Sequence, residues 1–454
     1  MSTTPGSLQE RDITYVLHPY TNAVKHREIG PIVIESGEGI HVYDATGKKY
    51  IEGMAGLWSV AVGFNEQRLV DAAARQMQKL PFYHSFTHKT HTPSIELAEL
   101  LVESTHGKMS RAFFTNSGSE ANDTVIKMLW YYNNALGRPQ KKKIISRQRA
   151  YHGVTVASAS LTGLAPNHKD FDLPIPQVRH VRCPDFYREG LPGETEVQFA
   201  ERLAAELEDL ILAEGADTIA GFIGEPVMGA GGVIIPPETY WERIQEVCRK
   251  HDILVIVDEV ITGFGRLGKM YGSDVFGIEP DIMVLSKQIT SSYLPFAAVL
   301  INKKVDDVIA SHSGKLGVFG HGYTASGHPV AAAVAIENIR IIEEKGLVDN
   351  AARVGQKLQS ALQELSDHPL VGQVRGMGLI AAVELVADKS TRAPFDPAGS
   401  VGTAVAARCH ENGLIVRNIQ DAVAFCPPLI ITEQEVDDMV ARFRKSLDEV
   451  AATL

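Results

Sequence analysis

Five short apolar runs, separated by stretches of helical periodicity, limit the possible folds of this chain more than any other feature. They lie between about residues 60 and 330 and read KKIISR, AGFIGEP, ILVIVDE, DIMVLSK and FAAVLIN. Short β-rich runs that alternate with helices are typical of crossover units, in which helices cover both faces of a sheet. The pattern therefore predicts an α/β fold around a large buried sheet.

The two ends of the chain predict a second, smaller α+β unit. Short strand signals such as PIVIE and GIHVYD occur near the start, and LIAAVELV, GLIVRN and AVAFCPP alternate with helical patterns near the end. The segment HPVAAAVAIENIRIIEEKG has helical spacing and stops at Gly346, so we expect a long connecting helix. We predict three segments: residues 1–59 packing with the small domain, 60–330 as the large domain, and 331–454 as connecting helix and C-terminal small domain.

Composition and charge argue against several classes of protein. The 454 residues are 44% hydrophobic and 22% charged, with a net charge of -11, which does not suit a nucleic-acid surface. No apolar run approaches the roughly 20 residues of a membrane helix, and the polar N-terminus MSTTPGSLQERD lacks a signal-peptide core. Four scattered cysteines without a CxxC favour reduced thiols. We expect a soluble, cytoplasmic protein.

The stretch TNSGSEAND places small residues directly before a helical pattern. Ser117, Gly118 and Ser119 then lie at a helix start, where backbone N–H groups, the helix dipole and two hydroxyls can bind a phosphate. A plain helix cap would use the same residues, so this motif alone leaves both readings open.

Two further groups lie at the ends of predicted strands. Lys287 follows the strand IMVLS, and Asp258 and Glu259 end the strand LVIV, 29 residues earlier. Carboxyl ends of neighbouring parallel strands line one crevice, so Asp258 and Lys287 are expected close together. Pyridoxal 5'-phosphate needs a lysine for its aldehyde, an aspartate for its ring nitrogen and an anion site for its phosphate. Because strand side chains alternate, Glu259 should point away from Asp258 toward a partner that the sequence does not identify.

The sequence resembles the class III (ω-amino) aminotransferases along nearly its whole length, from LHPYTNA to AFCPPLIIT. The shared motifs include TNSGSEANDT, AYHGVT, GEPVMGAGGV, DEVITGFGR, LSKQ and HGYTASGHP. This resemblance implies the pyridoxal-phosphate-dependent transferase fold of type I, with a large mixed-sheet α/β domain and a smaller α+β domain. It also implies pyridoxal 5'-phosphate as cofactor, and a homodimer or tetramer with active sites at the subunit interface.

The resemblance assigns site residues one by one. Lys287 would bond to the cofactor aldehyde and act as proton carrier, and Asp258 would pair with the ring nitrogen. The remaining cofactor-binding residues are Ser117, Gly118 and Ser119 with Thr324 of a neighbouring subunit at the phosphate, Tyr151 and Val260 at the ring faces, and His152 and Glu225 beside the cofactor.

The substrate side follows from the same resemblance. Tyr20, Trp58 and Phe86 would line an aromatic amine pocket with Tyr151, and Arg417 of GLIVRN would bind a carboxylate through its planar fork. Core packing of the aromatic residues and a surface arginine are the alternatives. The chain departs from common family patterns at Thr262, Leu267 and Ser292, which affects the expected pocket shape.

We therefore predict a ping-pong aminotransferase that moves an amino group from an ω-amino acid or primary amine to pyruvate, giving alanine. Three alternatives remain open at this point. They are another pyridoxal-phosphate reaction such as racemisation or decarboxylation, a metal site at His84, His88 and His91 of YHSFTHKTH, and a non-enzymatic binding module. The prediction favours no metal.

Overall fold

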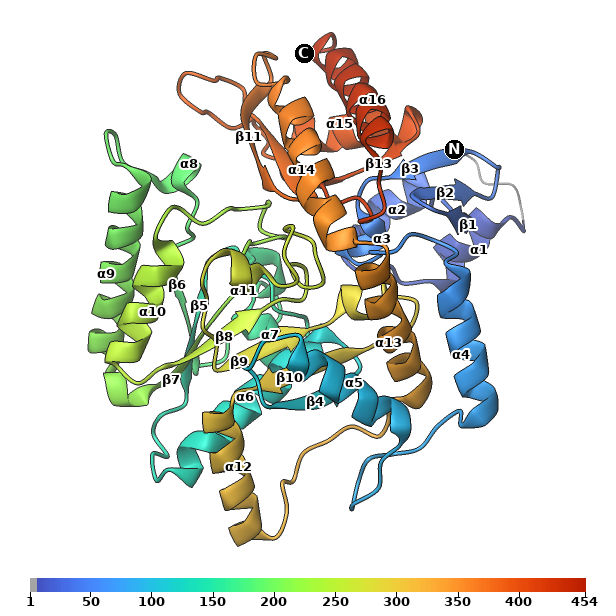
Figure 1. Cartoon of the computed structure of the whole chain (residues 1–454). Coiled ribbons are helices and arrows are strands. Elements are labelled where there is room, and N and C mark those ends of the chain that lie inside the picture. Colours follow the sequence, from blue (N-terminus) through green and yellow to red (C-terminus); the bar gives the residue numbers. More distant parts are fainter. Residues whose placement is uncertain (1–5) are drawn as a thin grey trace.

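The chain folds around a seven-stranded mixed sheet (Figure 1). The structure is a computed structural model that describes residues 6–454. One strand, β10, runs antiparallel to both of its neighbours, and the other pairs are parallel. The spatial order is β4 (Arg111–Thr115), β10 (Ala297–Ile301), β9 (Ile282–Leu285), β8 (Leu254–Asp258), β7 (Ile219–Gly224), β5 (Lys143–Arg147) and β6 (Val178–Val181). The predicted α/β fold with a large mixed sheet is confirmed.

Helices cover both faces of this sheet. In β8, Leu254 and Ile256 belong to one apolar cluster, whereas Val255 and Val257 belong to another, as side-chain alternation requires. Burial of each such side chain contributes roughly 1.5–3 kcal/mol. The first cluster includes residues of α6 (Gly118–Ala135), α7 (Val156–Leu161) and α12 (Lys303–Leu316), and the second includes residues of α5 (Thr92–Glu103), α9 (Glu196–Glu214) and α10 (Tyr240–Lys250).

The start of the chain pairs with a segment near its end. A four-stranded sheet contains β1 (Ile34–Glu38), β2 (His41–Asp44) and β3 (Lys49–Glu52) in antiparallel order, and β13 (Leu414–Ile415) adds in parallel beside β3. The N-terminal helices are α1 (Leu8–Tyr15), α2 (Ala23–Ile29), α3 (Ala55–Trp58) and α4 (Gln67–Lys79). The domain boundaries at 59 and 330 stay a prediction.

The long helix expected before Gly346 is α13 (Pro329–Glu344), with proline in its first turn. Gly346 has a φ of 59° and connects it to α14 (Leu347–Gln363). A third sheet follows in the order β11 (Val371–Met377), β12 (Ile380–Leu385), β15 (Ala422–Phe425) and β14 (Arg417–Ile419), with α15 (Ser400–Glu411) and α16 (Glu433–Ala451) beside it (Figure 1).

Short helical turns complete the description: α8 (Phe186–Glu189), α11 (Gly272–Val275), η1 (Ala165–Asn167), η2 (Ala216–Thr218) and η3 (Lys287–Ile289). Residue Asp258 pairs with Val284 in the parallel register of β8 and β9, so the residues that follow these two strands emerge at one edge of the sheet. None of the helices in residues 6–454 combines the length and apolar character needed to cross a membrane.

Candidate active site

One cavity of about 410 Å³ lies at the carboxyl ends of the central strands. Its walls come from β8, the turn after β9, the start of α6, and segments from both ends of the chain. The sequence-predicted residues that line it are Tyr20, Trp58, Gly118, Ser119, Tyr151, His152, Glu225, Asp258, Val260, Lys287 and Arg417. The fold therefore brings together residues that are up to 397 positions apart in the sequence.

Asp258 is buried at the end of β8 and accepts three hydrogen bonds. His152 Nδ1 donates to Oδ2 over 2.7 Å, Asn122 Nδ2 donates to the same oxygen over 3.0 Å, and the Val260 amide donates to Oδ1 over 3.1 Å. Burial by itself would raise the pKa of Asp258, but these bonds, led by that from His152, hold the pKa below its ordinary value. Asp258 is thus an ionised carboxylate inside the cavity.

Glu259, the neighbouring acid, faces away from the cavity. Its carboxylate accepts the amides of Gly272 and Ser273 at 2.9 and 2.6 Å, and the hydroxyl of Thr262. Burial raises the pKa of Glu259. The partner that the sequence did not identify is therefore the first turn of α11, and Glu259 supports the loop after β8.

Lys287 follows β9 and reaches the same cavity from a strained backbone. Its φ of 44° is in the left-handed region, which non-glycine residues rarely occupy. Within residues 6–454 its ammonium has no hydrogen-bond acceptor, and burial lowers its pKa despite the nearby carboxylates of Asp258 and Glu225. Burial therefore favours the neutral, nucleophilic amine.

The first turn of α6 presents unpaired backbone donors to the cavity. Ser117 is the N-cap, and its hydroxyl accepts the Glu120 amide over 3.2 Å, so this side chain is used in capping and does not line the cavity. The amides of Gly118 and Ser119 have no acceptor in the described chain. Two free amides at the start of an 18-residue helix suit a phosphate group.

The segment Tyr151–Gly153 forms another part of the cavity wall. Glu225 accepts the Tyr151 amide through Oε1 and the Gly229 amide through Oε2, both at 3.1 Å, which fixes this wall against β7. Gly153 has a φ of 132°, and a Cβ there would lie 2.6 Å from Ser119 Oγ, so only glycine fits. Burial is the main cause that raises the pKa of Tyr151, and the nearby Tyr20 raises it further.

Aromatic residues and a positive charge also line the cavity. Trp58 is 2% exposed, and its loop is held by Glu52, which accepts the Gly56 amide. Burial raises the pKa of Glu52 to about 8. Arg417 projects from the start of β14, and no acidic group among the residues the structure describes forms a salt bridge with it. Arg417 is therefore available to an anionic ligand.

Three sequence-predicted residues lie outside this cavity of the single chain: Ser117, Phe86 and Thr324. Phe86 is 41% exposed and packs beside Gly322, where an added Cβ would lie 3.0 Å from its ring. Thr324 is exposed, at a position that the resemblance assigns to the active site of a neighbouring subunit.

The histidines of YHSFTHKTH do not converge in the described part of the chain. His91 caps α5 and contacts Ser94, with distances of 3.3 Å to the amide and 3.1 Å to the hydroxyl. His84 accepts the Phe86 amide, and His88 is exposed. These residues therefore present no common metal-binding face.

Asn122 is the main site residue that sequence reasoning missed. It is 1% exposed on α6 and joins Asp258 to the His152 carbonyl, to which it donates over 2.7 Å. Its Oδ1 and the Nε2 of His152 have no partner in the described residues. A polar residue on the inward face of α6, within the quoted motif, was the available signal. Other lining residues that were not predicted are Pro19, Leu57, Gly153, Leu164, Ala230, Ile261 and Ser286.

Comparison with known families decides the class of this site. The family model described as "Aminotransferase class-III" matches residues 21–447. The chain belongs to the class III aminotransferases. Class III aminotransferases use pyridoxal 5'-phosphate, and the residues present fit this cofactor. The ionised Asp258, the free amides of Gly118 and Ser119, and the unpaired Lys287 are the three kinds of group that the cofactor requires.

Individual class III aminotransferases are similar over almost the full chain. The ω-transaminase from Pseudomonas jessenii in complex with PMP has 64% sequence identity and a TM-score of 0.97, with 98% of each chain covered. A structure described as a transaminase with L-ala has 60% identity and a TM-score of 0.92, covering 93% of this chain and 100% of the other. Gamma aminobutyrate transaminase 1, mitochondrial, of Solanum lycopersicum is 54% identical over 435 residues, 96% of this chain and 84% of the relative.

Proposed function

We propose that this class III aminotransferase moves an amino group from an ω-amino acid or a primary amine to pyruvate, giving alanine, by a ping-pong mechanism. One observation carries the proposal. Lys287 and Arg417 line the same aromatic-walled cavity, and neither side chain has a salt-bridge partner in the described chain. The similar transaminase with L-ala supports alanine as the product, and the similar gamma aminobutyrate transaminase supports an ω-amino acid as a donor.

The walls of the cavity would hold the cofactor in one orientation. The Gly118 and Ser119 amides would bind its phosphate, Tyr151 and Val260 would contact its ring, and the Asp258 carboxylate would keep a proton on the ring nitrogen. His152 and Asn122 act through Asp258, because their hydrogen bonds keep it ionised and fix its direction. When bound, pyridoxal phosphate supplies an aldehyde that takes up the amine and a ring that accepts the released electron pair.

Lys287 would then move the proton. Burial lowers its pKa and so favours the neutral amine, which could accept the proton from the reacting substrate carbon and deliver it to the cofactor carbon that had carried the aldehyde. Asp258 and Glu225 lie near enough to stabilise the ammonium that forms when Lys287 carries the proton. The same residues act in reverse when the keto acid accepts the amino group.

Arg417 would select the acceptor. Its guanidinium can form two parallel hydrogen bonds with the carboxylate of pyruvate, while Trp58 and Tyr20 provide an apolar surface for the donor side chain. An amine without a carboxylate leaves Arg417 without a partner, so its binding depends on the aromatic walls. The cavity therefore accommodates both half-reactions.

We expect Arg417→Ala to raise the KM for pyruvate by about 10- to 100-fold, which corresponds to the roughly 1.5–3 kcal/mol of charge-assisted hydrogen bonds. The KM for 1-phenylethylamine, which has no carboxylate, should stay within about threefold. Steady-state kinetics with alanine detection measure both constants.

The surface variant Arg353→Ala is the matched control, because Arg353 is 62% exposed and pairs with Glu433 away from the cavity. It should leave both KM values unchanged. Equal increases in both KM values for Arg417→Ala, or no increase for pyruvate, would contradict the assignment of Arg417 to the acceptor carboxylate.

We further propose a homodimer, or a tetramer built from it, in which Thr324 of the partner subunit completes the phosphate site. Its exposure on the single chain is compatible with this position. Racemisation and decarboxylation on the same scaffold are not favoured, because the family model and the similar proteins reported above are aminotransferases.

A further inference from the structure

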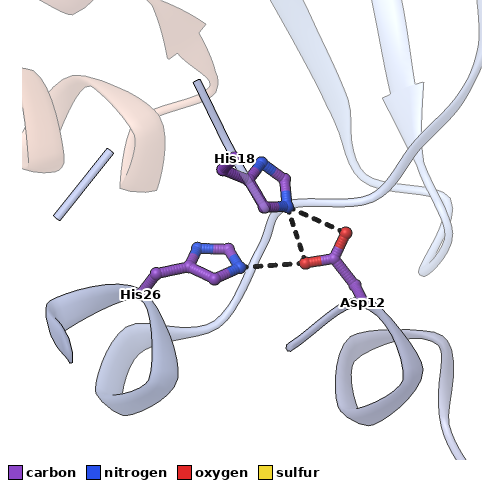
Figure 2. Close-up of side chains that lie close together, drawn as sticks. All are labelled: Asp12, His18 and His26. Atoms are coloured by element: carbon purple, nitrogen blue, oxygen red, sulfur yellow. Dashed lines mark hydrogen bonds and ion pairs between the residues drawn. The ribbon is translucent and has the colours of Figure 1, made fainter. Parts of the chain in front are cut away.

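A second cluster of ligand-type side chains lies outside the active-site cavity, in the N-terminal segment. Asp12 is on α1, His26 is on α2, and His18 lies in the connection between these helices. Figure 2 shows both imidazole rings directed at one carboxylate: His18 Nε2 lies 2.9 and 2.8 Å from the two oxygens, and His26 Nε2 lies 2.9 Å from Oδ2.

The geometry of this cluster is close to that of a metal site. One ligand atom from each residue lies within 4.8 Å of the other two, whereas the ligand atoms of a tetrahedral zinc site are roughly 3.3 Å apart, given bond lengths near 2.0 Å. The two imidazole nitrogens already lie 2.8 and 2.9 Å from Asp12 Oδ2, so an ion between the three ligand atoms requires only that side-chain rotation widen these two distances by about 0.5 Å. In the described chain the Nδ1 atoms of both histidines make no hydrogen bond, so each ring can carry its proton there and present Nε2 to an ion.

The surroundings also suit an ion. The side chains of His18, His26 and Asp12 are 30%, 13% and 20% exposed, so the cluster is partly shielded but open to solvent. A cavity of about 240 Å³, lined by both histidines, adjoins it and has room for water ligands.

We propose that Asp12, His18 and His26 form a binding site for a divalent transition-metal ion such as Zn²⁺, with water in the remaining position. Two imidazoles and one carboxylate suit Zn²⁺ and its first-row neighbours better than Mg²⁺ or Ca²⁺, which prefer oxygen ligands. The sequence did not predict this site, because the spacings of six and eight residues match no compact metal motif.

An ion here would connect α1, α2 and the loop between them to the active site. His18 is followed directly by Pro19 and Tyr20, which line the active-site cavity, and Tyr20 Oη accepts a hydrogen bond from Asn167. Metal binding would therefore restrict the segment that carries one wall of the amine pocket. Asp12, His18 and His26 do not themselves line the active-site cavity, so an ion there would support the pocket and not take part in the chemistry.

Equilibrium dialysis of tag-free, chelator-treated holoenzyme against Zn²⁺ tests the proposal. Wild-type protein should bind one Zn²⁺ per chain, and Asp12→Asn and His26→Gln should each weaken binding by at least about 10- to 100-fold, since each loses a direct ligand. Bound Zn²⁺ should also slow amide hydrogen exchange in residues 8–29 of the wild type.

His88→Gln is the control, because His88 is exposed and outside the cluster. It should bind Zn²⁺ as the wild type does. The proposal is overturned if wild-type holoenzyme binds clearly less than one Zn²⁺ per chain, which would leave a hydrogen-bonded cluster only. It is also overturned if the two variants bind Zn²⁺ normally, or if bound Zn²⁺ leaves exchange in residues 8–29 unchanged, because the ion would then be elsewhere.

Discussion

Replacing Lys287 with alanine is expected to lower kcat for amine-to-pyruvate transfer by at least about 10³-fold, within the range found for general acid–base groups. The variant loses the unpaired amine that the cavity holds beside Asp258 and Glu225, and no other lysine lines this cavity in the described chain. Steady-state formation of alanine from pyruvate measures the loss. Pyridoxal phosphate should still bind, because the α6 amides and Asp258 remain.

Lys303→Ala provides the matched control for the loss of a lysine. Lys303 is 79% exposed and forms only a surface pair with Asp307, so its removal should change kcat by less than about twofold. Retention of more than a tenth of the wild-type kcat by Lys287→Ala would remove Lys287 from the reaction.

The second large effect is expected for Asp258→Asn, which should lower kcat by about 10²- to 10⁴-fold. The side chain keeps its size, but a neutral amide cannot stabilise a protonated ring nitrogen as the carboxylate does. The His152 and Asn122 hydrogen bonds to Oδ2 would also lose their charged acceptor. The kcat of the cofactor-loaded variant, with thermal unfolding of the same sample, measures the effect.

Glu259→Gln is a strong control because the two acids are adjacent and equally buried, but face opposite sides. Glu259 holds Gly272, Ser273 and Thr262, so its substitution should lower the Tm while kcat per loaded site stays within about threefold. A large loss of kcat in Glu259→Gln with little loss in Asp258→Asn would reverse the assigned roles.

The large sheet could be predicted because its strands are marked locally. Each of the five apolar runs contains a strand of the seven-stranded sheet, and alternation along β8 correctly separates Asp258 from Glu259. Pro329 and Gly346 mark the ends of α13 by backbone chemistry that requires no tertiary contact. Strands and helices that are marked by apolar periodicity, or by one proline or glycine at a helix end, could therefore be predicted from the sequence.

Features that depend on distant contacts could not be predicted. The parallel pair of β3 and β13 joins residues more than 360 positions apart, and neither strand signals the other. Asn122 could be noticed as a polar residue on the inward face of a helix, but its hydrogen bond to Asp258 appears only where α6 passes that carboxylate. The pocket role of Phe86 stays a prediction, because in the single chain its ring packs beside Gly322, far away in sequence.

Transfer of an amino group between alanine and a cofactor held at Lys287 can be measured in an alanine half-reaction. Purified holoenzyme is mixed with L-alanine without any amino acceptor, and pyruvate and the cofactor spectrum are followed together. We expect one pyruvate per cofactor-loaded chain, with conversion of the cofactor to its pyridoxamine form. Release of D-alanine or carbon dioxide without pyruvate, or an unchanged spectrum with no product, would contradict it.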